Sequence, residues 1–390
     1  MDKIDKKVID LISAQRKFDG RFVGILKQQE SVSAIVRVHN PLHLGMLERR
    51  FNVTNLFPFI RSVGITCNLE DAIKLERMQE VEYVSAQGKV TALGVDDKEK
   101  NGAREVDTYK FDTEEALSNA NGSESDINVL SQELDGEGVT MCVMDTGISL
   151  HSDLSVPKER IVHFVDMING ETLPYDDNGH GTFVSGVACG NGLLSAGRIC
   201  GVAPKSNLVG IKVISKSGES GAFKILDGMQ WLFDNYRQYG IRVVCMSFGA
   251  DPQDFADPLK VGAEMLARSG LIVVAACGNS GVDGIKSPAI SPEVISVGAV
   301  SDDDKVAPFS SRGSYNGVFR PDVYAKGVDV KGISAGGTYS YMSGTSAAAP
   351  YVAGACCLIC QQYKNVTPRQ AKNMILSNSV NIGGNRVLKL

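Results

Sequence analysis

Three polar residues stand where a charge-stabilised serine nucleophile needs them. Asp145 ends the apolar run VTMCVM, His180 lies between two glycines in DDNGHGTFVSG, and Ser346 stands among small residues in SGTSAAAP. Such a nucleophile consists of a serine that attacks, an imidazole that removes its proton and a carboxylate that stabilises the imidazolium. A carboxylate at the end of a buried strand is costly unless its charge is used. The three residues therefore predict nucleophilic catalysis.

Each of these residues also has an ordinary structural interpretation. Asp145 can be read as a helix cap, His180 as a satisfied turn residue and Ser346 as a packing residue. One match alone would favour these interpretations. Three matches in this chain order, each within its own local pattern, favour catalysis.

The elements that must position these residues follow from residue 127 onward. Near-continuous apolar runs predict strands, and amphipathic stretches predict helices between them. Strands of this kind are typical of a parallel sheet covered by helices, in which ligands bind at the carboxyl ends of the strands. Strands are predicted in GVTMCVMD, SNLVGIKVI, IRVVCMSFG and LIVVAACG, and helices in AFKILDGMQWLFDNYRQYG and PLKVGAEMLARSG.

The motifs VMDTGI, NGHGTFVSGVACG and SGTSAAAPYVAG resemble those of the subtilisin-like serine proteases, the subtilases, which share the order Asp, His, Ser. The resemblance covers residues 127–390. It implies an α/β three-layer fold with a mostly parallel central sheet flanked by helices. It also implies a serine endopeptidase that works through an acyl-enzyme. By this resemblance Asp145 orients the imidazole, His180 is general base and then acid, and Ser346 is the nucleophile.

The resemblance also implies which residues hold the substrate. Asn279 in VVAACGNSG would stabilise the oxyanion together with the Ser346 backbone N–H, although a turn residue before glycine is the alternative. An uncharged specificity pocket implies a large apolar residue before the scissile bond; its walls would be Ser247, Phe248, Gly249, Ala276, Cys277 and Gly278. The segment SGES would pair with an extended substrate by strand addition, through Gly218, Glu219 and Ser220. Glu219 is either a selectivity residue or a solvated loop residue.

Residues 1–93 predict a separate small α+β domain of the ferredoxin-like kind, with strands in SAIVRV, TNLFPFI and SVGITC and a helix in LEDAIKLERMQ. The stretch EVEYVSAQGKVTAL resembles a subtilase propeptide, a domain that chaperones folding and inhibits the active site. On that pattern Leu93 occupies the specificity pocket, and the chain cuts itself after Leu93 or within the following linker. In that linker, residues 94–126, ten acidic residues stand against four basic ones. The catalytic domain is predicted over 127–390.

Composition limits the remaining possibilities. The chain has 390 residues, of which 43% are hydrophobic, and this suffices for one large and one smaller domain. The net charge of −5 gives no argument for nucleic acid or anionic membrane as a partner. The amino end lacks the apolar core of a signal peptide, and no apolar run is long enough to span a bilayer. The nine cysteines lie mostly in apolar runs, as free thiols do in a reducing compartment. We therefore expect a cytoplasmic protein.

Some features depart from the secreted subtilases and are closer to their intracellular alkaline branch. Asp153 falls one residue early, and the loop GNGLLSAGRICG lacks the usual asparagines, so the first structural calcium site looks degraded. No cofactor is expected for the chemistry, and the cysteines of ACCLIC lack partners at zinc spacing. Ala347 replaces the methionine that commonly follows the nucleophile, which predicts tolerance of peroxide.

Three functions are compatible with these motifs. The first is a general endopeptidase, and the second is a maturation protease for one peptide or protein partner. The third is a catalytically silent binding protein on the same fold. An intact triad together with Asn279 argues against the third, because a silent relative has no need of all four residues.

Overall fold

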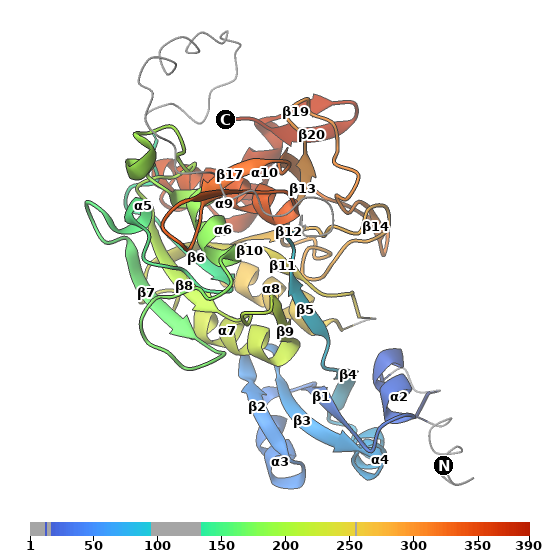
Figure 1. Ribbon diagram of the computed structural model, residues 1–390. Helices are drawn as coiled ribbons and strands as arrows, with labels where there is room; N and C mark the ends of the chain where they lie inside the picture. The colour runs from blue at the N-terminus through green and yellow to red at the C-terminus, as the bar shows by residue number, and fades with distance from the viewer. Residues whose placement is uncertain (1–11, 14–16, 95–133, 254–255) are drawn as a thin grey trace.

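The computed structural model describes residues 12–13, 17–94, 134–253 and 256–390. They form a large unit and a smaller amino-terminal unit (Figure 1). The predicted linker lies outside the described residues except for Gly94. Self-cleavage within that linker therefore falls outside them too.

A nine-stranded sheet forms the middle of the large unit. Its order is β19-β20-β16-β13-β12-β10-β6-β8-β7; β19 pairs antiparallel with β20, and the other neighbours pair in parallel. The strands β6, β10 and β12 are buried along their whole length or nearly so, which explains their continuous apolar runs. The strands are β6 (Thr140–Asp145), β7 (Ile161–Asp166), β8 (Asn207–Lys212), β10 (Ile241–Met246), β12 (Ile272–Ala276), β13 (Ile295–Val300), β16 (Val323–Lys326), β19 (Ser379–Ile382) and β20 (Asn385–Leu388).

Helices cover both faces of this sheet and give three layers. Helices α6 (His180–Cys189), α9 (Thr345–Gln362) and α10 (Pro368–Ser377) share one buried apolar cluster with the sheet. Helices α7 (Ala222–Asn235) and α8 (Pro258–Arg268) share another. The predicted α/β three-layer fold is confirmed. Shorter elements are α5 (Ser152–Ser155), η5 (Leu193–Ser195), β14 (Gly313–Tyr315), β15 (Val318–Arg320), β17 (Val330–Ile333) and β18 (Tyr339–Met342).

The small unit is built on a four-stranded antiparallel sheet of order β2-β3-β1-β4. One helix connects β1 to β2 and another connects β3 to β4, which is the β-α-β-β-α-β succession of ferredoxin-like units. The strand predicted in TNLFPFI ends at Phe57, because Pro58 has no N–H to donate and begins a 3₁₀ turn instead. The elements are α2 (Gly20–Leu26), β1 (Ser31–Val38), η1 (Pro41–His43), α3 (Leu44–Arg50), β2 (Val53–Phe57), η2 (Pro58–Ile60), β3 (Ser62–Asn68), α4 (Leu69–Arg77) and β4 (Val81–Ala86).

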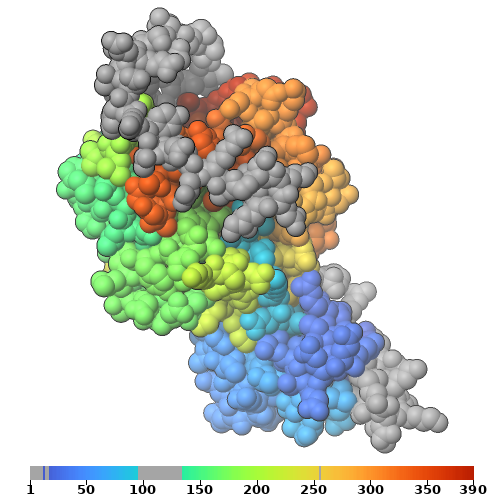
Figure 2. All heavy atoms as spheres, viewed as in Figure 1, coloured from blue at the N-terminus to red at the C-terminus, as the bar shows by residue number. Residues whose placement is uncertain are grey.

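The small unit packs against α7 and α8 of the large one. Phe57 and Phe59 belong to the buried cluster that these helices form. Asn55 Nδ2 donates to both carboxylate oxygens of Asp227, at 3.1 and 3.0 Å. The Phe59 backbone N–H donates to Gln230 Oε1 at 3.1 Å. Figure 2 shows the blue atoms of the small unit pressed against the larger one.

Strand β5 (Lys89–Ala92) leaves the small unit and enters the large one (Figure 1). It lies between β9 (Glu219–Gly221) and β11 (Phe248–Gly249) and is antiparallel to both. Addition of an extended peptide to an exposed strand edge in this way is a common mode of peptide recognition. The strand brings Leu93 and Gly94 to the triad.

Candidate active site

The fold brings Asp145, His180 and Ser346 to one end of the central sheet. Asp145 is the last residue of β6, His180 is the first of α6, and Ser346 is the second of α9. Asp145 Oδ1 lies 2.7 Å from His180 Nδ1, with 0% and 6% of the two side chains exposed. A hydrogen bond of this length between buried groups fixes the imidazole ring.

The pKa of the His180 imidazole depends on its burial and on the carboxylate of Asp145. Burial favours the neutral ring, but the charge of Asp145 and its hydrogen bond outweigh burial and hold the pKa of His180 above its usual value. His180 Nε2 has no hydrogen-bond partner among the described residues. A methyl group built on Gly94 would lie 3.4 Å from His180 Cδ2 and 3.8 Å from Nε2. The unpaired nitrogen therefore lies beside the residue that follows Leu93.

A network around Asp176, which sequence patterns do not indicate, holds these elements together. Asp176 Oδ2 accepts from the N–H and the hydroxyl of Thr182, at 2.8 and 2.7 Å, which fixes the first turn of α6. Thr146 donates its hydroxyl to Asp176 Oδ1 at 2.9 Å and its N–H to Asp145 Oδ1 at 2.7 Å. Asp176 thus links the start of α6 to the end of β6.

The carbonyl oxygen of Leu93 is the point on which the donors converge. Ser346 Oγ donates to it at 2.7 Å, and Asn279 Nδ2 donates to it at 2.5 Å. Asn279 cannot turn its amide around, because its Oδ1 accepts from both the N–H and the hydroxyl of Thr345, each at 2.9 Å. Thr345 is a positioning residue that the sequence did not indicate.

Gly344 gives the carbonyl the room to approach. A Cβ built on Gly344 would lie 2.7 Å from the Leu93 oxygen, 3.1 Å from Ser346 Oγ and 3.2 Å from Asn279 Nδ2. The first of these distances is shorter than any real carbon–oxygen contact of this kind, so a side chain here would displace the peptide. Small residues around Ser346 therefore serve access as well as packing.

Leu93 is 6% exposed and belongs to the same buried cluster as Ala276. Its N–H donates to the Ser247 carbonyl at 3.0 Å, and its Cδ1 would lie 3.1 Å from a Cβ on Gly249. Phe248 and Cys277 point their side chains into the cluster on the other side of the sheet, so only their backbones are available here. Gly278 has a φ of +115° and donates its N–H to Thr345 Oγ1 at 3.2 Å.

The predicted edge segment lies along the other side of β5. The Gly218 carbonyl accepts from the Ala92 N–H at 3.0 Å. In the strand register Thr91 pairs with Glu219, and Val90 pairs with Ser220. The Glu219 carboxylate also forms an ion pair with Lys89, with Nζ 2.6 Å from Oε1, and both side chains are at least half exposed.

A fully buried lysine lies next to the triad aspartate and was overlooked in the sequence. Lys212 ends β8, where it pairs with Asp145 in the strand register. It is 0% exposed, and its ammonium donates to Asp177 Oδ1 at 2.6 Å and to the Thr146 carbonyl at 2.5 Å. One lysine at the end of the apolar run SNLVGIKVI was the signal that could have revealed it.

The residues around Asp153 do not fit a calcium ion. Asp153 is 0% exposed; its Oδ1 accepts from the Leu194 N–H at 2.8 Å and its Oδ2 from the Tyr339 hydroxyl at 2.7 Å. The guanidinium of Arg160 binds three carbonyl oxygens nearby, those of Cys189, Ser206 and Asp153. Calcium needs six to eight oxygen ligands. Here a protein cation and protein donors already use the oxygens.

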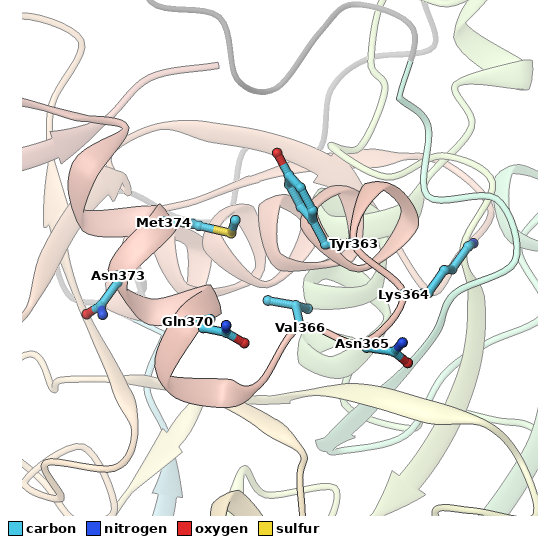
Figure 3. Close-up of a pocket in the computed structure, with 7 residues that line it drawn as sticks. All are labelled: Tyr363, Lys364, Asn365, Val366, Gln370, Asn373 and Met374. Carbon is cyan, nitrogen blue, oxygen red and sulfur yellow. The ribbon is translucent and has the colours of Figure 1, made fainter.

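The remaining features of the described residues add no further residue to this site. No group of three or more acidic, histidine or cysteine residues among them is arranged to hold a metal ion, and the nine cysteines are free thiols. None of the described helices has the length and apolar character needed to cross a membrane. A hollow of about 480 Å³ between the end of α9 and α10 is lined by residues 363–366, Gln370, Asn373 and Met374 (Figure 3). It contains none of the residues considered above.

Sequence comparison agrees with this geometry. The model of the Subtilase family matches residues 136–390. The chain therefore belongs to the subtilase family. It is 40% identical over 275 residues to the serine protease AprX of Bacillus subtilis (strain 168), an alignment that covers 63% of this chain and 62% of AprX. The chain thus spans a little over three fifths of the length of that relative.

In two further comparisons the match covers a larger share of the other protein. Subtilisin DY of Bacillus licheniformis is 36% identical over 260 residues, which is 65% of this chain and 88% of that protein. The crystal structure of a cold-adapted subtilisin-like serine proteinase superposes with a TM-score of 0.56 at 30% identity. That superposition covers 66% of this chain and 90% of the other.

Proposed function

We propose that the chain is a serine endopeptidase that hydrolyses peptide bonds through an acyl-enzyme. The observation that carries this proposal is the convergence of Ser346 Oγ and Asn279 Nδ2 on one peptide carbonyl, that of Leu93, beside the Asp145–His180 pair. A donor at this position stabilises the negative charge that develops on the oxygen when a nucleophile attacks the carbonyl carbon.

In the first step the Ser346 oxygen attacks the carbonyl carbon, and its proton passes to His180 Nε2. Asn279 Nδ2 and the Ser346 N–H, at the amino end of α9, hold the oxyanion. His180 then gives the proton to the leaving amine, and Asp145 stabilises the imidazolium meanwhile. Water attacks the acyl-enzyme by the same route, with His180 again as base.

The amino-terminal unit is the proposed intramolecular inhibitor, and Leu93–Gly94 is the proposed processing bond. The contacts of Leu93 with the two catalytic donors and of Gly94 with His180 support this proposal. A cytoplasmic location is proposed as well, on the ground that nine free thiols suit a reducing compartment.

The direct test is labelling with a fluorophosphonate, which reacts with activated serines. We expect the label on Ser346 and on no other serine. Prior treatment with a peptide aldehyde, which occupies the active site, should prevent this labelling. Absence of label on the processed protein would rule out the peptidase and leave the silent binding protein.

Substrate preference is expected to follow the segment that fills the site. Leu93 is 6% exposed and Val90 is 0% exposed, so peptides with large apolar residues at these two positions should be cut fastest. A lysine four residues upstream of the residue before the scissile bond, the position that Lys89 has relative to Leu93, should be favoured by Glu219. Exposed ion pairs contribute only about 0.2–1 kcal/mol, so this preference is roughly 1.4- to fivefold and falls with added salt.

A peptide library measured at low and high salt, with Glu219→Gln beside the wild type, checks these preferences. The lysine preference should disappear in the variant, while the apolar preference stays. A lysine preference that survives in Glu219→Gln would show that another group reads this position. A broad profile favours general proteolysis, whereas cleavage of one sequence alone favours a dedicated partner.

Stability is expected to be independent of calcium at Asp153. Chelation should leave the unfolding temperature unchanged, because the oxygens there are satisfied by Leu194, Tyr339 and Arg160. Arg160→Met should instead cost at least about 3 kcal/mol, since it leaves buried carbonyl oxygens without donors. Thermal unfolding with and without chelator measures both effects. A loss of several degrees on chelation that is absent in Asp153→Asn would contradict this expectation.

A further inference from the structure

A thioether lies beside the proposed nucleophile. Met342 is the last residue of β18, and its Sδ lies 3.8 Å from Ser346 Oγ. The serine hydroxyl, which donates to the Leu93 carbonyl oxygen at 2.7 Å, therefore has the sulfur as a weak second acceptor.

The position of Met342 overturns the argument for peroxide tolerance. That expectation took Ala347 to mean that no thioether adjoins the nucleophile. Met342 packs against a small apolar cluster formed by Phe183, Val187, Val330 and Ala347 itself. The chain therefore supplies a thioether next to Ser346 from the preceding strand, while Ala347 is fully buried and Met342 is partly exposed.

The sulfur faces the path of the bound peptide. A Cβ built on Gly94 would lie 3.8 Å from Met342 Sδ and 3.8 Å from His180 Nε2. The sulfur and the imidazole of His180 thus both lie close to the residue after the proposed scissile bond. When that path is empty, a molecule as small as peroxide that reaches Ser346 also reaches the sulfur.

We propose that Met342 is an oxidation site whose sulfoxide inactivates the enzyme, an inference that rests on the proposed peptidase function. A lone pair of the sulfur attacks one oxygen of hydrogen peroxide, so that an S–O bond forms as the O–O bond breaks. The departing hydroxide takes the proton from the transferred oxygen and leaves as water. The thioether loses two electrons, and the peroxide is reduced.

The sulfoxide acts on the nucleophile in two ways. Its oxygen is a strong acceptor where the thioether was a weak one, so it competes with His180 for the Ser346 proton. The added oxygen also occupies space where the residue after the scissile bond passes Met342. Loss of proton transfer to a positioned base costs about a hundredfold or more, so partial competition should lower kcat/KM by about tenfold or more.

The cysteine thiols compete poorly for the oxidant. Eight of the nine cysteines are buried, and Cys200 is the exposed one. Burial raises the pKa of the Cys277 thiol, which points away from the pocket that holds Leu93, to about 12. Its Sγ also donates to the Ser311 carbonyl at 2.9 Å. Oxidation requires the thiolate, which is scarce in such thiols.

The test treats the processed enzyme with graded hydrogen peroxide and follows peptide hydrolysis, fluorophosphonate labelling and the mass of each methionine-containing peptide. We expect Met342 to gain one oxygen in step with at least a tenfold loss of hydrolysis, and methionine sulfoxide reductase to restore both. Met342→Leu should keep the activity that it starts with. The control Met374→Leu, on α10, should lose activity as the wild type does. Cys200→Ser should also behave as the wild type.

Three results would overturn the proposal: full activity with Met342 oxidised, loss of activity with Met342 intact, or equal loss in Met342→Leu. If Met342→Leu does not fold, the first two results and the repair by the reductase still decide the matter. Failure of the proposed peptidase function is a separate outcome. It would be seen as absent hydrolysis and labelling before any peroxide is added.

Discussion

Ser346→Ala is expected to abolish hydrolysis and to leave the Leu93–Gly94 bond uncut. Ser346 Oγ is the only described oxygen nucleophile that hydrogen-bonds to the Leu93 carbonyl. Removal of the serine costs about a millionfold in kcat in subtilisin, because the other triad residues cannot act without it. Activity on an external peptide should therefore fall to the background.

The same variant reports on processing through its size. Wild-type protein should run as two pieces in denaturing electrophoresis, and Ser346→Ala should run as one. The matched control is Ser280→Ala, an exposed serine beside Asn279 that should process normally. If both Ser346→Ala and the wild type run as one intact chain, self-processing is wrong. If both run as two pieces, another protease makes the cut.

Asp145→Asn is expected to lower kcat by about ten-thousandfold and to change the pH profile. The amide keeps the shape of the carboxylate but removes its charge and favours the wrong imidazole tautomer. In the wild type, kcat/KM falls as the pH drops through the raised pKa of His180, because the imidazolium cannot accept the serine proton. Without the charge of Asp145 the imidazolium loses its main stabilisation, so the acid limb should move to lower pH.

The profile of kcat/KM from acidic to neutral pH checks this direction. Asp303→Asn, which removes one exposed carboxylate paired with Lys305, is the control for a general change in charge. Its limb should coincide with that of the wild type. An acid limb that stays in place in Asp145→Asn would show that a group other than His180 titrates there.

The residues of the proposed triad could be predicted from the sequence because each ends or begins a regular element, whereas Asn279 was indicated by the resemblance to the subtilases. Asp145 closes a buried strand, His180 and Ser346 open helices, and Asn279 follows a buried strand. In a parallel sheet these ends meet at the same edge, so local patterns predict that Asp145, His180 and Ser346 lie near one another.

The supporting contacts were not accessible because they depend on side-chain directions between distant segments. Asn55 meets Asp227 across 172 positions of the chain. Thr345 holds Asn279 across 66 positions, and nothing in the motif around either residue states this. Met342 lies only four residues before Ser346, yet its approach depends on how β18 turns into α9. Periodicity carries no information about such turns.

The small unit contacts the large one along β5 with Leu93 and through a broader surface further from Ser346. That surface includes the contacts of Asn55 and Phe59 with α7 and the hydrogen bond from Gln253 Nε2 to the Ala86 carbonyl. The two kinds of contact bear on how activity appears with time. The short connection between β4 and β5 joins the strand to that surface, so the small unit would act as a bivalent ligand after the proposed cut at Leu93. When one contact detaches, the other keeps it nearby at high effective concentration.

Avidity of this kind is lost all at once when the small unit unfolds or is cut. Either contact alone is expected to bind more weakly than both together, and an extended strand without the distant surface would be a substrate rather than an inhibitor. The delay before activity should then shorten in a variant that weakens only the distant anchor, such as Asn55→Ala. The lifetime of the folded small unit, rather than the chemistry at Ser346, would set the timing of the enzyme.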